Sequence, residues 1–173
     1  KGHYYNPNIP SEEIFTTPRA GDADGIVYAT KPLSYQGQLI ENFSVRFENG
    51  KVVEVKAEKN QELLEKMVSM DEGAAMLGEC ALIAYDSPIN NLGILFYNTL
   101  FDENASCHLA LGRGFSNCVR GYEDMTNEQL KEHGINDSMI HVDFMIGSKD
   151  LSITGITAKG ERVAIFKDGN WAF

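Results

Sequence analysis

The pair His141-x-Asp143 has the clearest chemical potential in the sequence. It lies within residues 139–146 (MIHVDFMI), whose composition predicts a strand. Side chains two positions apart on a strand point to the same face, so the imidazole and the carboxylate lie side by side. Such a pair can bind one divalent cation, or two if the carboxylate bridges. The spacing fits equally well an ordinary buried histidine that is hydrogen-bonded to a carboxylate.

Other candidate ligands lie beside apolar segments. His108 lies in residues 106–112 (SCHLALG), Glu79 precedes the apolar run 80–85, and Glu12 and Glu13 are adjacent. Taken singly, such a histidine fits a hydrogen-bonded core residue, and such carboxylates fit solvated surface groups. Their types nevertheless match a site for divalent cations.

Several common catalytic patterns are absent from the sequence. It contains neither the G-x-S-x-G of serine hydrolases nor the H-E-x-x-H of zincins. The segment 112–114 (GRG) lacks the further glycine of a dinucleotide-binding loop, so we interpret it as a turn. These absences leave a metal centre open beside the interpretation of the same residues as an ordinary buried pair and solvated carboxylates.

Composition limits the class of protein. The chain has 173 residues, of which 43% are hydrophobic, enough for one domain with one core. A net charge of -10 argues against binding to nucleic acid, and no apolar run approaches the 20 residues of a membrane span. Three cysteines without C-x-x-C spacing, and no recognisable signal peptide, favour free thiols in the cytoplasm.

The early part of the chain predicts a β-hairpin. Residues 26–34 and 38–47 are rich in β-branched and aromatic residues, as is typical of strands. Asn49-Gly50 predicts a tight turn into a strand at residues 51–56. The apolar face of this hairpin is expected to carry Val45, Phe47, Val53 and Val55.

The rest of the chain predicts further strands and a few short helices. The other expected strands are residues 80–85, 106–112, 139–146, 151–156 and 162–166. The expected helices are residues 60–73, capped by Asn60, 92–100 and 126–133, capped by Thr126. Together these elements predict an α+β fold with a mixed, largely antiparallel β-sheet and a few short helices.

Longer segments of the sequence resemble a known family. They are NPNIPSEEIFTTP, DEGAAMLGECALIAYDSPI, GILFYNTLFDENASCHLALG and INDSMIHVDFMIGS. In order and spacing they resemble the thermophilic-type metalloaminopeptidases of peptidase family M29, from about Asn8 to the C-terminus. The resemblance implies that residues 1–173 are a single catalytic domain, the C-terminal part of a larger two-domain protein whose N-terminal domain is absent. The start at Lys1, followed by an extended segment at residues 6–10, agrees with that expectation.

The resemblance also implies a set of site residues. Metal ligands carried over by the motifs are Glu13, Glu79, His108, His141 and Asp143, with Glu12 as the competitor of Glu13. Five such ligands suit two divalent ions, zinc or cobalt before manganese or magnesium. Glu13 or Glu79 would also serve as the catalytic proton shuttle, and Glu103 would orient His108.

The implied activity is that of a cytoplasmic, homodimeric aminopeptidase acting on peptides with a free N-terminus, without nucleic acid or membrane as partner. One departure favours an alternative. Phe115 stands where the family has an active-site tyrosine, and Tyr85 and Tyr122 are the candidate substitutes. The alternative is a truncated or degenerate domain that binds metal or a partner without catalysis. A third interpretation is a domain whose metal is purely structural.

Overall fold

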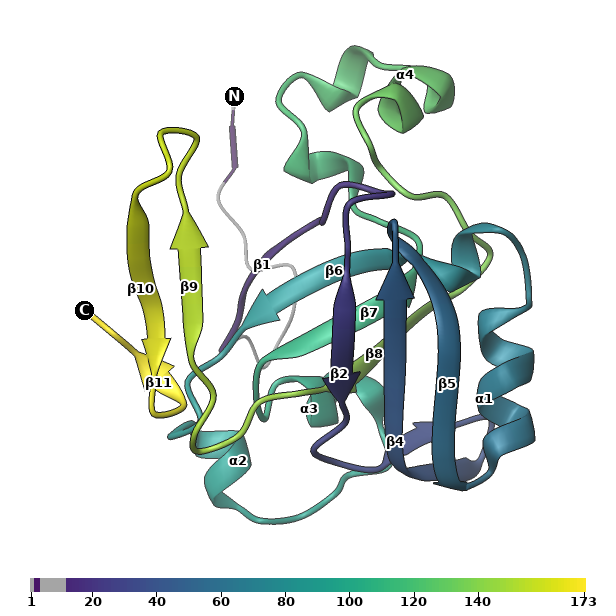
Figure 1. Cartoon of the computed structure of the whole chain (residues 1–173), viewed down its shortest axis with the longest axis vertical. Coiled ribbons are helices and arrows are strands. Elements are labelled where there is room, and N and C mark those ends of the chain that lie inside the picture. The colour runs from purple at the N-terminus through teal and green to yellow at the C-terminus, as the bar shows by residue number, and fades with distance from the viewer. Residues whose placement is uncertain (1, 4–11) are drawn as a thin grey trace.

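The computed structural model describes residues 2–3 and 12–173 of the chain, in which short helices surround antiparallel sheets (Figure 1). The extended segment predicted at residues 6–10 lies outside the described residues. Every strand pairing within the described part is antiparallel, which agrees with the predicted α+β class.

One four-stranded sheet, hereafter the site sheet, has the strand order β1-β6-β7-β8. Its strands are β1 (Ile14–Thr16), β6 (Leu77–Leu82), β7 (His108–Gly112) and β8 (His141–Met145). Strands were predicted near β6, β7 and β8, at residues 80–85, 106–112 and 139–146, whereas β1 was not predicted. The sheet therefore gathers residues that are far apart in the sequence.

A second sheet is built around a long hairpin. Its strands are β2 (Gly25–Tyr28), β3 (Leu33–Tyr35), β4 (Gln38–Glu48) and β5 (Lys51–Lys59). Asn49 and Gly50 connect β4 to β5 with φ angles of 50° and 76°, the left-handed conformation that this tight turn requires. The hairpin predicted from Asn49-Gly50 is confirmed.

The predicted apolar face of this hairpin is wrong at one position. Val45 and Phe47 are buried, but Val53 is 46% exposed, and Val52 packs toward the core in its place. A β-bulge at Arg46 and Phe47 shifts the register, so that Phe47 pairs with Val52. Strict alternation does not hold across a bulge, because one strand carries an extra residue there.

The main core lies between these two sheets and is closed by α1 (Gln61–Val68). Phe43 of β4 and Phe144 of β8 meet there, with ring centroids 5.7 Å apart. Asn60 is at the N-cap position as predicted, but its side chain donates to the Leu39 carbonyl and does not cap the helix. The helix ends at Val68, before the predicted Gly73. Other fully buried core residues are Leu33, Ile40, Leu64, Met67 and Leu111.

Two predicted elements are interrupted. The segment 26–34 forms two strands, β2 and β3, separated at Pro32, which has no N–H to give to a strand. The helix predicted at 92–100 is wrong: that segment is mostly irregular, with Gly93 and Tyr97 at positive φ. Helices form on either side of it instead, α2 (Pro88–Asn91) and α3 (Thr99–Glu103).

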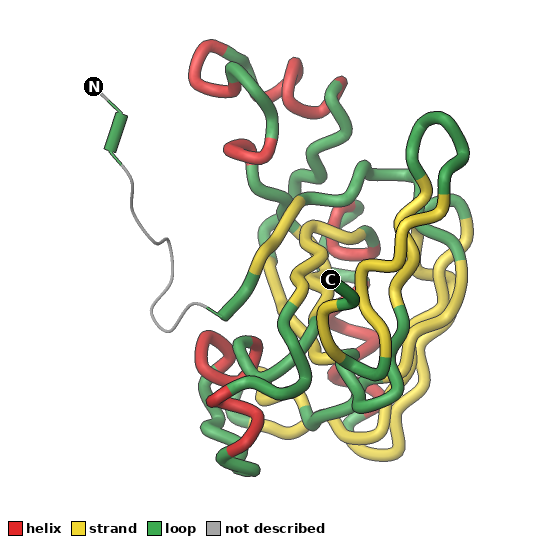
Figure 2. Tube along the Cα trace, turned by 90° about the vertical axis from the view of Figure 1, so that its left-hand side faces the viewer, coloured by secondary structure: helices red, strands yellow, loops and turns green. Residues whose placement is uncertain are grey.

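The remaining elements lie at the periphery (Figure 2). A long excursion between β7 and β8 carries α4 (Asn127–Glu132), capped by Thr126 and Gln129 as a capping box. At the other end of the molecule lie α2 and α3. Further short elements are η1 (Gly73–Ala75), η2 (Ser116–Cys118), η3 (Tyr122–Asp124), β9 (Ile153–Ile156), β10 (Arg162–Lys167) and β11 (Asn170–Trp171).

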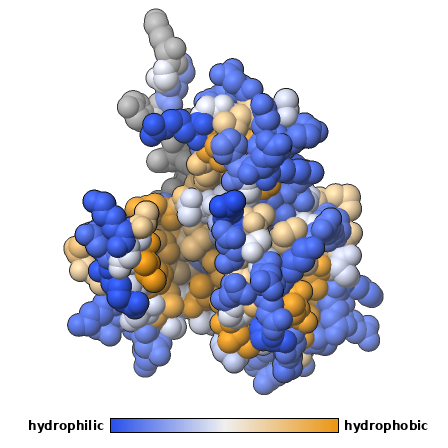
Figure 3. Space-filling view, turned by 45° about the horizontal axis from the view of Figure 1, so that its top comes forward, coloured by the Kyte–Doolittle hydropathy of each residue, from blue (hydrophilic) through white to orange (hydrophobic). Residues whose placement is uncertain are grey.

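The surface agrees with the acidic composition. Hydrophilic residues cover most of the face shown in Figure 3, and apolar residues gather along the hollow between the lobe of β9–β11 and the rest of the molecule. No helix in the described part of the chain is both long and apolar enough to cross a membrane. All three cysteines are free thiols, as predicted.

Candidate metal centre

The two faces of the site sheet carry different kinds of side chain. Leu109, Leu111, Val142 and Phe144 point into the main core. On the opposite face, the register aligns Glu79 with Ala110 and Ala110 with Asp143, while His141 lies opposite Gly112. His108 pairs with Ala81, and Ala81 pairs with Phe15, so Phe15 points to the same face as His108. Glu13 lies two residues before Phe15 and therefore points to this face as well. The sheet thus brings all five predicted ligands to one face.

A bulge next to Gly78 sets the direction of Glu79. Leu77 pairs with Leu111 and Glu79 with Ala110, so Gly78 is the extra residue in β6. A Cβ at Gly78 would lie 2.3 Å from the Arg113 carbonyl oxygen. Only glycine permits this close approach of the two backbones, which keeps the Glu79 side chain on the site face.

Both histidines are oriented by backbone carbonyls. His108 Nδ1 lies 3.1 Å from the Ser106 carbonyl oxygen, and His141 Nδ1 lies 2.7 Å from that of Arg113. A ring nitrogen facing a carbonyl must carry the proton, so each histidine donates from Nδ1 and turns Nε2 toward the carboxylates. Metal-binding histidines are commonly held in this way.

The side chains form two groups that could each hold a cation. Glu13, Glu79 and His108 form one group, and Glu79, His141 and Asp143 form the other, with ligand atoms within 4.8 Å of one another in each. His108 Nε2 is 3.4 Å from Glu13 Oε2, while His141 Nε2 is 3.2 Å from Glu79 Oε2 and 3.3 Å from Asp143 Oδ1. Glu79 is common to both groups, as a bridging carboxylate would be.

Burial distinguishes Glu13 from its competitor Glu12. The Glu13 side chain is only 3% exposed, whereas Glu12 lies at the surface. The Glu12 backbone N–H donates to Asn104 Oδ1, which fixes the chain just ahead of β1. The structure therefore places Glu13, and not Glu12, in the site.

Burial and close charges perturb the titration of the site. Burial raises the pKa of Glu79, partly offset by its hydrogen bond with His141. Burial also opposes the charged forms of His141 and Asp143, but the attraction between the two side chains, together with the contributions of the other neighbouring groups, outweighs it. The pKa of His141 is raised to about 10 and that of Asp143 is lowered. Without a metal, His141 therefore supplies positive charge to the carboxylates.

Glu103 belongs to this site but not in its predicted role. Burial, followed by the charge of Asp143, raises the pKa of Glu103 to about 9, and its carboxyl group hydrogen-bonds Asp143. The prediction that Glu103 orients His108 is wrong, because the Ser106 carbonyl has that position. Neither of the two ligand groups includes Glu103.

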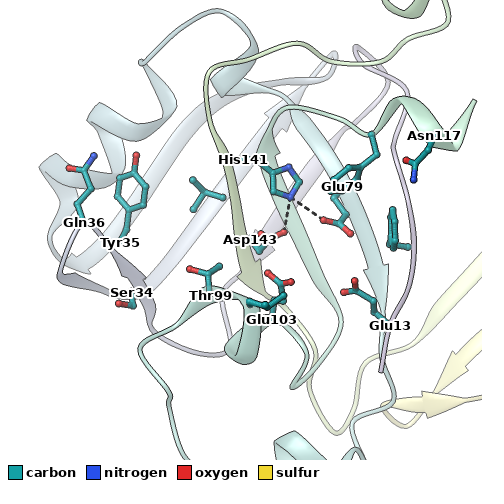
Figure 4. A pocket seen from close by; sticks show the side chains of 14 residues that line it. Glu13, Ser34, Tyr35, Gln36, Glu79, Thr99, Glu103, Asn117, His141 and Asp143 are labelled. Carbon is teal, nitrogen blue, oxygen red and sulfur yellow. Dashed lines mark hydrogen bonds and ion pairs between the residues drawn. The ribbon is translucent and has the colours of Figure 1, made fainter. Parts of the chain in front are cut away.

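The ligand groups open onto a pocket of about 490 Å³ (Figure 4). Phe115 lines it, with its ring centroid 4.9 Å from that of His141 and 5.1 Å from that of Phe15. Neither Tyr85 nor Tyr122 is among the described lining residues, so the expected substitutes for a phenol are wrong, and Tyr35 lines the pocket instead. The lining residues missed from the sequence are Phe15, Ser34, Tyr35, Gln36, Thr99, Leu100, Asn117 and Val142.

Two atoms at the site are suited to bind a cation. His108 Nε2 and Asp143 Oδ1 are fully buried and make no hydrogen bond within the described part of the chain. A buried polar atom without a partner is costly, and here both atoms face other ligand atoms. Two imidazoles and three carboxylates are a suitable donor set for zinc, cobalt or manganese.

Comparison with known proteins identifies related sequences. A family model described as thermophilic metalloprotease (M29) matches residues 1–171. Aminopeptidase AmpS of Bacillus subtilis is 55% identical over 172 residues, which are 99% of this chain and 42% of that protein. Aminopeptidase T of Thermus aquaticus is 44% identical over 171 residues, 99% of this chain and 41% of that protein. The chain thus spans about two fifths of the length of these relatives.

A solved structure is similar across nearly the whole chain. Wild-type AmpT from Thermus thermophilus superposes with a TM-score of 0.91 at 42% identity, covering 97% of this chain and 41% of that one. A score this high at this identity means that the same arrangement of sheets is present in both proteins.

Proposed function

Because the chain belongs to the thermophilic metalloprotease family M29, we propose that it forms the metal-binding catalytic part of an aminopeptidase. The substrates would be peptides with a free N-terminus. The observation that carries this proposal is the pair of ligand groups joined through Glu79, with both histidines turning Nε2 toward the carboxylates. The names of the relatives, aminopeptidases S and T, support the same reaction.

The proposed ligands are Glu13, Glu79 and His108 for one divalent ion, and Glu79, His141 and Asp143 for the other. Zinc or cobalt are the first candidates, because imidazole favours them, and manganese or magnesium follow because of the carboxylates. Two such ions would lower the pKa of a water molecule and polarise the scissile carbonyl.

The protein's own groups would handle the proton and the substrate. Glu13 and Glu79 both line the pocket, so either carboxylate can take a proton from the attacking water and pass it to the leaving amine. Phe15 and Phe115 cover the side of the pocket next to His141 and exclude water from it. Phe115 is held there by its backbone N–H, which donates to Thr17 Oγ1 at 2.7 Å.

Hydrolysis of L-leucine p-nitroanilide tests the proposal. The protein is assayed after chelation and again with zinc, cobalt, manganese or magnesium. We expect activity only with metal, and a loss of at least about a thousandfold for Glu79→Gln, because the carboxylate shared by both groups is gone. The matched control is Glu12→Gln, an exposed carboxylate that should leave the rate unchanged.

The alternative, a non-catalytic metal-binding domain, predicts a different outcome of the same assay. Two bound metal ions without turnover at any metal concentration would favour it over the aminopeptidase. The homodimer and the cytoplasmic location stay predictions, which sedimentation and cell fractionation would test.

A further inference from the structure

The turn between β3 and β4 brings three polar side chains to the pocket. Ser34 and Tyr35 are the last residues of β3, Gln36 begins the turn, and all three line the pocket. Figure 4 shows them together on one side of the ligand groups, with Glu13 and Asn117 on the other side. Gln36 is exposed, whereas Ser34 and Tyr35 are partly buried. The turn therefore lies at the mouth of the pocket.

The residue at the tip of this turn is uncommon for its backbone conformation. Tyr35 pairs with Gln38, so Gln36 and Gly37 form a two-residue turn, with φ angles of 49° and 75°. Among the described residues other than glycine, six have a positive φ, and four of these are Asn or Asp, the usual types. Gln36 and Tyr97 are the two exceptions. The longer amide of Gln36 is thus held at the pocket at some cost in backbone strain, as is common at functional sites.

The strands on both sides of the turn anchor it to the rest of the molecule. Leu33 and Ile40, which pair at its base, are both buried in the main core. Ahead of β3, the Thr30 backbone N–H donates to the Met145 carbonyl of β8 at 2.8 Å. β3 itself packs against β8, the strand that carries two of the proposed ligands. The turn is therefore fixed relative to the ligand groups, as a preformed binding surface must be.

The polar side chains of the turn are available to a ligand. Those of Ser34, Tyr35 and Gln36 form no hydrogen bond with any other residue in the described part of the chain. A hydroxyl, a phenol and a primary amide offer donors and acceptors without net charge. Peptide groups need the same partners, because each has one N–H donor and one C=O acceptor.

The aromatic part of the pocket has a different chemistry. There Phe15 and Phe115 present apolar rings next to His141. Such rings suit an apolar side chain, but they give the N–H and C=O groups of a bound peptide no conventional partner. Peptide groups that lose water without gaining a partner weaken binding, so an extended peptide is better accommodated along the polar turn.

From these features we infer that Ser34, Tyr35 and Gln36 bind the part of the peptide that follows the scissile bond. The inference rests on the proposed aminopeptidase function and adds the residues that recognise the leaving peptide. The scissile carbonyl would lie at the ligand groups, and the following residues would run past the turn to solvent, since Gln36 lies at the open end of the pocket. The preferred substrates are therefore peptides with further peptide groups after the scissile bond.

Two substrates that differ only after the scissile bond test the inference on the metal-loaded protein. L-Leucine p-nitroanilide has no peptide group there, whereas L-leucyl-glycyl-glycinamide has one, followed by a primary amide. We expect Gln36→Gly and Tyr35→Phe each to lower kcat/KM for the peptide by about 3- to 10-fold, the cost of one neutral hydrogen bond. Each should change kcat/KM for the anilide by less than about twofold.

The variants are chosen to leave the turn intact. Glycine accepts the φ of 49° at position 36 without strain, so Gln36→Gly removes the amide and keeps the turn, and Tyr35→Phe removes only the hydroxyl. Gln38→Ala is the matched control, because Gln38 is exposed on the same hairpin and is not among the described residues that line this pocket. It should leave both substrates unchanged. A fall in one variant alone would assign the contact to that residue. An equal fall for both substrates, or no fall for the peptide in either variant, would overturn the inference.

The same variants separate the inference from the proposed function. Hydrolysis of both substrates with no effect of Gln36→Gly or Tyr35→Phe would reject the role of the turn and keep the aminopeptidase. If the metal-loaded protein hydrolyses neither substrate, the proposed function fails, and calorimetry with L-leucyl-glycyl-glycinamide then tests the turn. Weaker binding of this peptide by either variant would keep the turn as a peptide-binding site. Equal binding by all variants, or no binding by the unaltered protein, would reject it.

Discussion

The two faces of the site sheet make opposite contributions to the molecule. One face places Leu109, Leu111 and Phe144 in the main core, where burial of apolar surface stabilises the fold. The other face gathers three carboxylates and two imidazoles, most of them buried, at distances where like charges repel. Because successive side chains of a strand point to opposite faces, the same strands carry the apolar residues that stabilise the fold and the charged residues whose repulsion destabilises it.

This difference indicates that the polar face is kept for a ligand. Side chains selected only for stability would not leave His108 Nε2 and Asp143 Oδ1 buried without hydrogen bonds. We therefore expect substitutions on the apolar face to change the free energy of unfolding, and substitutions on the polar face to change metal binding.

The largest effect on stability is expected for Phe144→Ala. Phe144 is 1% exposed and packs against Phe43, so its removal should cost about 3–5 kcal/mol of unfolding free energy, measured by urea denaturation of the metal-free protein. Val163→Ala is the control, because Val163 is 45% exposed and should cost less than about 0.5 kcal/mol. A loss for Phe144→Ala no larger than that of the control would contradict the assignment of this face to the core.

Added metal should stabilise the folded protein through the polar face. At a metal concentration about a hundredfold above Kd, the free energy of unfolding should rise by about 2.7 kcal/mol. Glu79→Gln should lose most of this gain, because Glu79 belongs to both ligand groups. The comparison uses thermal or urea unfolding with and without zinc, and an equal gain in both proteins would argue against a shared ligand.

A smaller effect is expected at Asp71, a carboxylate outside the site. Asp71 accepts hydrogen bonds from the Met139 backbone and the Ser138 hydroxyl, which fixes the segment ahead of β8, and these bonds lower its pKa. Asp71→Asn should cost about 1–3 kcal/mol at pH 7. A lowered folded-state pKa gives stability that is complete above the ordinary value of about 3.9 and is lost as pH falls through the folded value.

The Asp71 prediction is checked by urea unfolding at pH 7 and near pH 3. The gap between the unaltered protein and Asp71→Asn should shrink at the lower pH. Asp22→Asn is the control, since Asp22 is exposed and forms only a 3.8 Å ion pair with Arg19. A gap that does not change with pH would show that the charge of Asp71 has no part in fixing the segment ahead of β8.

Local rules were sufficient for much of the fold. Asn49-Gly50 predicted the hairpin because few other pairs adopt two left-handed residues, and the alternation in residues 139–146 placed His141 and Asp143 on one face. Local rules gave the wrong secondary structure where contacts with the rest of the molecule determine the backbone conformation. The exposed apolar residues of 92–100 resemble a helix in periodicity, yet Gly93 and Tyr97 have left-handed backbones there.

The site could be predicted only in part, and for a physical reason. The five proposed ligands followed from motif order, but the grouping through Glu79 depends on the pairing of β6 with both neighbours and on the bulge at Gly78. Glu103 and Thr99 reach the pocket because α3 packs against β8, and neither lies in a pattern with a distinct spacing. The Ser106 carbonyl that orients His108 has no sequence signal at all.

Metal stoichiometry tests the central claim most directly. Calorimetric titration of the metal-free protein with zinc or cobalt, checked by elemental analysis, should give two equivalents per chain. His108→Ala and His141→Ala should each retain one, because each histidine belongs to a single ligand group. Binding of one ion or none by the unaltered protein would contradict a site of two cations joined through Glu79.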